Sequence, residues 1–145
     1  MLDRLKADLT RAMRERDATV VSTLRMLISQ AQYARIEARR DLRDEDYIAL
    51  LQRAVKTRRE SIAQFERGRR ADLADKERAE IAVIERYLPA PMSDEEAGLA
   101  VDALLREIGA AGTKDLGRAM KEFMARYRGR VDGKAVNALI AARLK

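Results

Sequence analysis

The segment Arg128–Lys134, which reads Arg-Gly-Arg-Val-Asp-Gly-Lys, has the residue types best suited to contact an anion. Two readings are open: a plain turn between two helices, or a contact surface for an acidic partner. Asp132 is expected to cap the following helix, and its carboxylate would repel a second anion at that helix end. Phosphate is therefore expected to meet side chains rather than helix amides. The expected phosphate contacts are Arg126, Arg128, Arg130 and Lys134, with Gly129 and Gly133 letting the backbone approach closely.

Other chemistry is limited by composition. The chain has no Cys and no His, which excludes disulfides, thiol catalysis and thiolate metal sites and removes the commonest general base. Acidic residues cluster at 44–46 and at 75–80, but the first cluster is typical of a helix start and the second alternates with Lys76 and Arg78, typical of a solvated face. We predict no catalytic residue, no metal site and no cofactor.

Two charged residues stand where apolar side chains are expected. Arg58 lies on the line 51-55-58-62-65, and Glu77 lies on the line 73-77-81-84-88. Both side chains either reach past the edge of the helix contact to water or form a half-buried structural ion pair that sets helix register.

Basic residues also cluster at 35–43 and at 67–70, and each cluster is either a solvated helix face or a binding surface. The group around Arg128–Lys134 is the best binding candidate because a short loop holds it together. Only Tyr127 is nearby to stack on a base, so phosphate and shape are the expected basis of recognition, as for structured RNA.

The elements that position these residues are predicted to be helices throughout. Apolar residues recur at helical spacing, aromatics make up only 4% of the chain, and no alternating strand pattern appears. We predict an all-α fold. An N-terminal antiparallel bundle of about four helices, with Asp17 as an N-cap and Gly68 at the C′ position of the third helix, precedes three short helices near 94–108, 114–128 and 133–144.

The double proline at Pro89 and Pro91 predicts a domain boundary, because each proline lacks an amide donor and disfavours helix before it. Ser93 and Glu96 form a predicted capping box that restarts the helix directly afterwards. The predicted domains are 1–90, an N-terminal helical domain, and 93–145, a C-terminal three-helix domain.

Charge is sorted along the chain. Residues 93–112 hold five acids and one base, whereas residues 113–145 hold nine bases and three acids. The net charge of +6 suits an acidic partner. No apolar run approaches the roughly 20 residues that cross a bilayer, and the N-terminus has no signal-peptide pattern. We expect a soluble, cytoplasmic protein without membrane contact.

Several segments together resemble the GatB/YqeY family of small bacterial proteins, and the likeness covers essentially the whole chain. One departure is Arg43, which stands where relatives often have a Ser or Thr cap. The segments that carry the resemblance are Ser22–Leu27, Arg58–Ile62, Asp72–Glu77, Ile84–Pro89, Asp115–Met120, Gly129–Lys134 and Val136–Leu139.

The resemblance implies a likeness to the tail of the B subunit of the tRNA-dependent amidotransferase, which recognises tRNA. It adds Asn137 to the expected RNA-binding residues, because Asn137 matches the family's terminal motif. It implies tRNA or other structured RNA as a partner and no catalysis by the chain itself, although a family-level description reads carbon-nitrogen ligase with glutamine as amido-N-donor. The alternatives are a protein-interaction adaptor and an amidotransferase component acting in trans.

Overall fold

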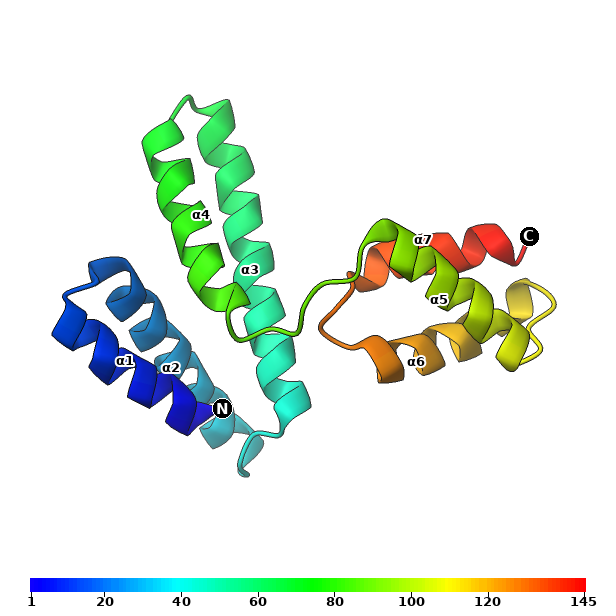
Figure 1. The fold of residues 1–145 in the computed structure, drawn as a ribbon, viewed down its shortest axis with the longest axis horizontal. Helices are drawn as coiled ribbons and strands as arrows, with labels where there is room; N and C mark the ends of the chain where they lie inside the picture. The colour runs from blue at the N-terminus through cyan, green and yellow to red at the C-terminus, as the bar shows by residue number, and fades with distance from the viewer. The chain divides into compact units, whose positions relative to one another are not determined.

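The computed structural model describes all residues, 1–145, and divides the chain into two compact units, Met1–Leu88 and Pro89–Lys145. Seven α-helices and one 3₁₀ turn are present and no strand, so the all-α prediction is confirmed (Figure 1). No helix combines the length and apolar composition needed to cross a bilayer.

The first unit consists of two helical hairpins. Helices α1 (Leu2–Glu15) and α2 (Ala18–Ala38) pack together, as do α3 (Asp44–Arg67) and α4 (Ala71–Glu85), and α2 contacts both α3 and α4. Asp17 caps α2 as predicted, since its carboxylate accepts the Val20 amide at 3.2 Å. The shared core is aliphatic. Its most deeply buried members are Leu5, Leu24, Leu27, Leu51 and Ile84.

The α2–α3 turn explains how α3 starts without a Ser or Thr cap at Arg43. The Asp46 carboxylate accepts the Arg43 backbone amide at 2.8 Å and pairs with Arg40 at 2.7 Å. The hydrogen bond from Arg40, helped by the Arg43 amide, lowers the pKa of Asp46 to about 2. Acid enrichment in the first turn of α3 therefore stabilises both the helix and the turn before it.

The turn between α3 and α4 corrects one prediction. Gly68 was expected at the C′ position, but it is the C-cap residue of α3, with φ −83°. Arg69, one residue later, adopts the left-handed conformation with φ 56°, and its amide bonds to the Glu66 carbonyl at 3.1 Å. The helix itself ends at Arg67, as expected, and the Gly68 amide still donates to the Gln64 carbonyl at 3.0 Å.

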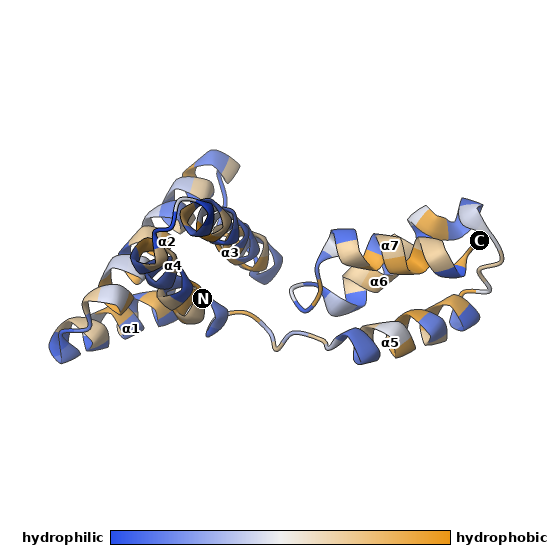
Figure 2. Cartoon of the chain, turned by 90° about the horizontal axis from the view of Figure 1, so that it is seen from above, coloured by the Kyte–Doolittle hydropathy of each residue, from blue (hydrophilic) through white to orange (hydrophobic).

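The second unit wraps three helices around Phe123, which is fully buried. Its elements are α5 (Asp94–Glu107), the 3₁₀ turn η1 (Thr113–Asp115), α6 (Leu116–Tyr127) and α7 (Gly133–Arg143). The predicted capping box at α5 is confirmed: Glu96 N donates to Ser93 Oγ at 3.1 Å, and Ser93 N donates to Glu96 Oε2 at 3.2 Å. Hydrophobic residues of α6 and α7 lie where the helices meet (Figure 2).

Candidate functional site

The α6–α7 loop is built from a glycine turn and a helix cap. Helix α6 ends at Tyr127, and Gly129 follows with φ 82°, a conformation that strains any residue with a Cβ. The Arg130 amide closes this turn on the Tyr127 carbonyl at 3.0 Å. Asp132 then caps α7 as predicted, accepting the Ala135 amide at 3.1 Å. Local contacts thus hold both ends of the loop.

Arg126 is engaged in a two-pronged ion pair. Its guanidinium donates to both carboxylate oxygens of Glu107, at 2.6 and 2.9 Å, and so joins α6 to the end of α5. The hydrogen bonds from Arg126 hold the pKa of Glu107 below its usual range. A phosphate at Arg126 would have to compete with this carboxylate.

Arg130 has a structural role that sequence reasoning missed. Its Nε donates to the Ala90 carbonyl at 2.8 Å, and its own carbonyl accepts the Met92 amide at 2.8 Å. Glu96 lies 4.0 Å from its guanidinium. These contacts fix the segment between Pro89 and α5 onto the α6–α7 loop. No local sequence signal predicts them, because residues 90 and 130 are 40 positions apart.

The other predicted contacts are open to solvent. Arg128 and Lys134 are exposed, and Asn137 is exposed in the second turn of α7. Gly133 is the first residue of α7 and has no positive φ. A Cβ at Gly133 would meet only Met124 Cε, at an ordinary 3.9 Å. Neither conformation nor packing within the unit requires glycine at 133, which distinguishes it from Gly129.

Tyr127 is not available as a stacking platform. Its ring packs against Phe123 with the centroids 4.7 Å apart, and it belongs to the rim of the apolar core. The loop therefore offers cations and an amide but no free aromatic face. Such a surface recognises phosphate and shape rather than unstacked bases.

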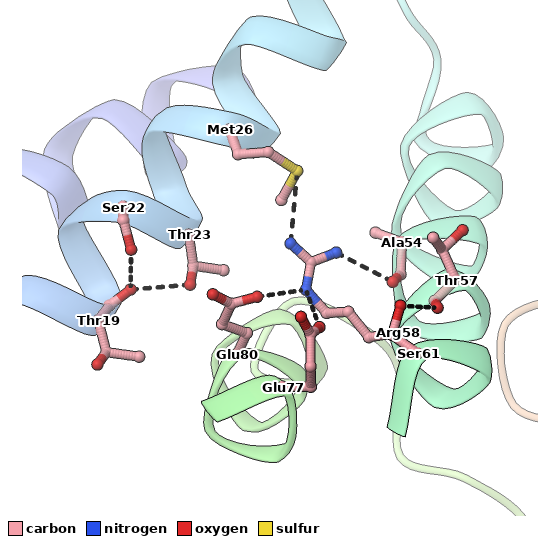
Figure 3. A network of polar contacts seen from close by, with 10 residues as sticks. All are labelled: Thr19, Ser22, Thr23, Met26, Ala54, Thr57, Arg58, Ser61, Glu77 and Glu80. Carbon is pink, nitrogen blue, oxygen red and sulfur yellow. Dashed lines mark hydrogen bonds and ion pairs between the residues drawn. The ribbon is translucent and has the colours of Figure 1, made fainter. Parts of the chain in front are cut away.

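The sequence outliers Arg58 and Glu77 lie in a network that joins three helices of the first unit (Figure 3). The Arg58 side chain is only 14% exposed, and its Nε lies 2.9 Å from Glu80 and 4.0 Å from Glu77. Its terminal nitrogens donate to the Ala54 carbonyl at 3.1 Å and to Met26 Sδ at 3.6 Å. Glu80, which the sequence placed on a solvated face, is the closer partner.

The Arg58 network has a structural rather than a chemical character. One guanidinium contacts two carboxylates, and both act as its ion-pair partners. No group of three or more His, Cys, Asp or Glu residues is arranged to hold a metal ion. The buried Thr23 hydroxyl beside it is satisfied by the Thr19 carbonyl at 2.8 Å. The arrangement can fix how α2, α3 and α4 meet.

The remaining basic clusters are mostly paired with acids. Arg35 pairs with Asp41 at 2.9 Å, and Arg70 pairs with Asp72 at 3.0 Å. Arg39 is exposed and makes no ion pair. These clusters largely compensate their own charge.

Comparison with known families assigns the chain. The model of the YqeY-like protein family matches residues 2–144. The chain belongs to this family. The match spans both units, so the family likeness is not confined to the short segments that first indicated it.

Relatives of this YqeY-like chain occur in fungi. One relative, from Pyrenophora tritici-repentis, is named altered inheritance of mitochondria protein 41, mitochondrial. The two sequences are 31% identical over 97% of this chain and 78% of that protein. The protein of the same name in Eremothecium gossypii is 37% identical over 74% of this chain and 60% of its own length. An uncharacterized protein of Schizosaccharomyces pombe is 32% identical over 59% of the chain and 69% of its own length.

The names of these relatives correct the predicted location. Two of the three are named as mitochondrial proteins, which contradicts the cytoplasmic location expected from the sequence. That expectation rested on the absence of an apolar signal or membrane segment. Such an absence does not distinguish one aqueous compartment from another, so the cytoplasmic prediction is withdrawn.

Proposed function

We propose that this YqeY-like chain binds tRNA or another structured RNA through the α6–α7 loop of its second unit and has no catalytic activity of its own. The observation that carries the proposal is the fixed loop itself. Gly129, Arg130 and Asp132 hold its backbone by local contacts, while Arg128 and Lys134 remain exposed. A held loop with exposed cations loses little conformational entropy when it meets a phosphate backbone.

The charge and the glycine at 133 support the same reading. Residues 113–145 hold nine bases and three acids, and the loop lies in this region. Gly133 has room for a Cβ within the unit and no positive φ, so a close approach by an outside ligand gives a reason for glycine there. Asn137, four residues further along α7, offers an exposed amide that can bond to a ribose or phosphate oxygen.

The resemblance to the amidotransferase tail supports RNA as the partner, because that tail recognises tRNA. The pairing of Arg126 with Glu107 and of Arg130 with Ala90 reduces the number of readily available phosphate contacts. Arg128 and Lys134, both exposed, are the principal contacts in the proposal, and Arg126 and Arg130 contribute by positioning the loop.

The test is the salt dependence of binding to purified total tRNA, measured by fluorescence anisotropy. Each phosphate neutralised contributes about 0.7 to the log–log slope for single strands. The double variant Arg128→Ala/Lys134→Ala is expected to bind more weakly and to flatten the slope by about 1.4. The effect should be alike for all RNAs tested, because phosphate contacts carry no sequence information.

The matched control is Arg53→Ala/Lys56→Ala on the exposed face of α3, which removes the same two charges from the first unit. It should leave the slope nearly unchanged. An equal loss in both double variants means that net charge rather than the loop governs binding. Unchanged binding in Arg128→Ala/Lys134→Ala means that the loop is only a helix connection.

The amidotransferase alternative has a separate assay. Glutamine-dependent amidation of glutamyl- or aspartyl-tRNA is measured with the amidotransferase subunits, with and without this chain. We expect no amide product from the chain alone. Amide formation that requires this chain would favour a component acting in trans.

A further inference from the structure

The end of α2 exposes two large apolar side chains next to each other. Tyr33 is 67% exposed and Ile36 is 75% exposed, the largest values among the large apolar residues of the chain. Residues three apart on a helix are neighbours on its surface. Met13 and Leu99, the other exposed large apolar residues, lie on different helices. The pair on α2 is therefore a local apolar surface rather than a scattered exposure.

Ile36 borders an open hollow of about 570 Å³ at the turn from α2 to α3. The turn around it is held by Arg40, which pairs with Asp46 at 2.7 Å and donates to the Asp41 carbonyl at 3.0 Å. The hollow is thus a preformed feature of the turn. Its lining residues are Gln32, Arg35, Ile36, Arg39, Arg40 and Asp41.

We propose that this surface docks an acidic amphipathic segment of a partner protein. We call it the α2 terminal patch and define it by Tyr33, Arg35, Ile36, Arg39 and Arg40. Apolar side chains of the segment cover Tyr33 and Ile36 and fill the hollow, and carboxylates on its flanks meet the arginines. Helices with this pattern bind grooves through apolar anchors at i, i+3, i+4 and i+7.

Charge complementarity identifies the occupant. Three arginines and one aspartate line the hollow, and Arg39 makes no ion pair. Arg35 and Asp41 are both exposed, 56% and 86% by side chain, so a partner carboxylate can replace Asp41 at little cost. An acidic flank gains these contacts, and a basic flank meets like charges.

Two other occupants fit the patch less well. In a symmetric pair of this chain the patch meets itself, which sets arginines against arginines. An RNA gains phosphate contacts from the arginines and a stacking face from Tyr33, but it leaves Ile36, the most exposed of the large apolar side chains, without an apolar partner. An acidic segment with an apolar side satisfies both the arginines and Ile36.

The test uses a displayed library of random peptides of about 16 residues, long enough for four helical turns. The library is selected on the immobilised full-length chain. Enriched peptides should carry Leu, Ile or Phe at helical spacing and Asp or Glu beside them. Synthetic copies should bind the chain in fluorescence anisotropy, and Ile36→Ser should weaken binding at least about tenfold. Arg39→Glu should weaken binding and reduce its salt dependence.

Leu99→Ser is the matched control, because it removes an apolar residue of comparable exposure, 65%, from α5 and should leave peptide affinity unchanged. Circular dichroism checks that each variant keeps its helix content. Enrichment of basic or uncharged peptides overturns the proposal, as does equal binding to wild type and Ile36→Ser. If Ile36→Ser keeps peptide binding but loses tRNA binding, the patch is assigned to RNA. If it keeps peptide binding but loses a concentration-dependent dimer, the patch is assigned to a second copy of the chain. The peptide-binding outcomes do not depend on the α6–α7 loop.

Discussion

The first unit, Met1–Leu88, places charged and phenolic groups between its helices, whereas the interior of the second unit, Pro89–Lys145, is apolar. In the first, Arg58 lies between α2, α3 and α4, and the Tyr87 hydroxyl donates to Asp8 beside the core. In the second, the ion pairs Arg126–Glu107 and Arg143–Asp102 lie on the outside. No buried side-chain nitrogen or oxygen lacks a partner in either unit.

The difference follows from helix length. Helices α5, α6 and α7 have 14, 12 and 11 residues, so the second unit has little surface to bury and uses it for apolar contact around Phe123. Helices α2 and α3 have 21 and 24 residues and bury enough apolar surface to hold a charged network as well. Such networks contribute little net stability but oppose sliding of one helix along another.

The largest expected effect concerns the dependence of the second unit on one aromatic residue. Phe123→Ala should lower the free energy of unfolding of the second unit by about 3–5 kcal/mol, because it empties the centre of a small core. We propose that the two units unfold separately, so amide hydrogen exchange in α1–α4 should stay unchanged. Exchange measured residue by residue by NMR distinguishes the units.

Leu27→Ala is the reciprocal control and should affect only the first unit. The fragments 89–145 and 93–145 sharpen the comparison, because the shorter one lacks the Met92–Arg130 and Ala90–Arg130 hydrogen bonds and should be the less stable. Loss of protection in both units on Phe123→Ala would contradict separate unfolding.

The second effect tests which carboxylate holds Arg58. Glu80→Gln should destabilise the first unit by about 1–2 kcal/mol, because it removes the 2.9 Å charged contact to a half-buried guanidinium. Glu77→Gln, at 4.0 Å, should cost less. Urea unfolding of both variants, each also made in an Arg58→Met background, measures the coupling. A larger effect of Glu77→Gln would reverse the assignment.

The third effect is a pH dependence confined to the first unit. Burial, followed by the hydrogen bond to Asp8, raises the pKa of Tyr87 to about 12. The unfolded tyrosine titrates near about 10, so the folded state binds this proton more tightly. The Tyr87 contribution to stability is complete below about pH 10 and is lost as pH rises through about 12.

Tyr87→Phe should cost about 1 kcal/mol at neutral pH, since Asp8 keeps its 2.8 Å contact with Arg11. It should also remove the loss of stability between about pH 10 and 12 that Tyr87 causes. Unfolding curves of both proteins across this range are compared. An identical alkaline decline in both would show that Tyr87 is not its source.

The smallest expected effect is a gain. Arg69 adopts φ 56° at the α3–α4 turn, where a residue with a Cβ is strained by about 1–2 kcal/mol. Arg69→Gly should stabilise the first unit by about 0.5–1 kcal/mol, since glycine relieves the strain but costs more entropy on folding. Gly129→Ala in the second unit, at φ 82°, should have the opposite sign. Thermal melting measures both.

The sequence alone determined the seven helices and the starts of α2, α5 and α7. The N-caps Asp17, Ser93 and Asp132 each bond to an amide three residues later, so the signal and its partner lie in one short segment. The double proline likewise marked the break before α5, because proline acts on its immediate neighbours. The basic loop and its glycine turn were predictable for the same reason.

Only the tertiary structure decided which side chains meet across helices. Glu80 rather than Glu77 is the nearer partner of Arg58, and the Arg130 Nε donates to the carbonyl of Ala90, 40 residues earlier in the chain. Met13 follows the buried Leu5 by eight residues, at helical spacing, yet it is half exposed. These outcomes depend on how far each helix is rotated and which helix lies opposite. Packing of the whole unit sets both, and a periodic pattern fixes a helix face only to within about one residue, or 100° of rotation.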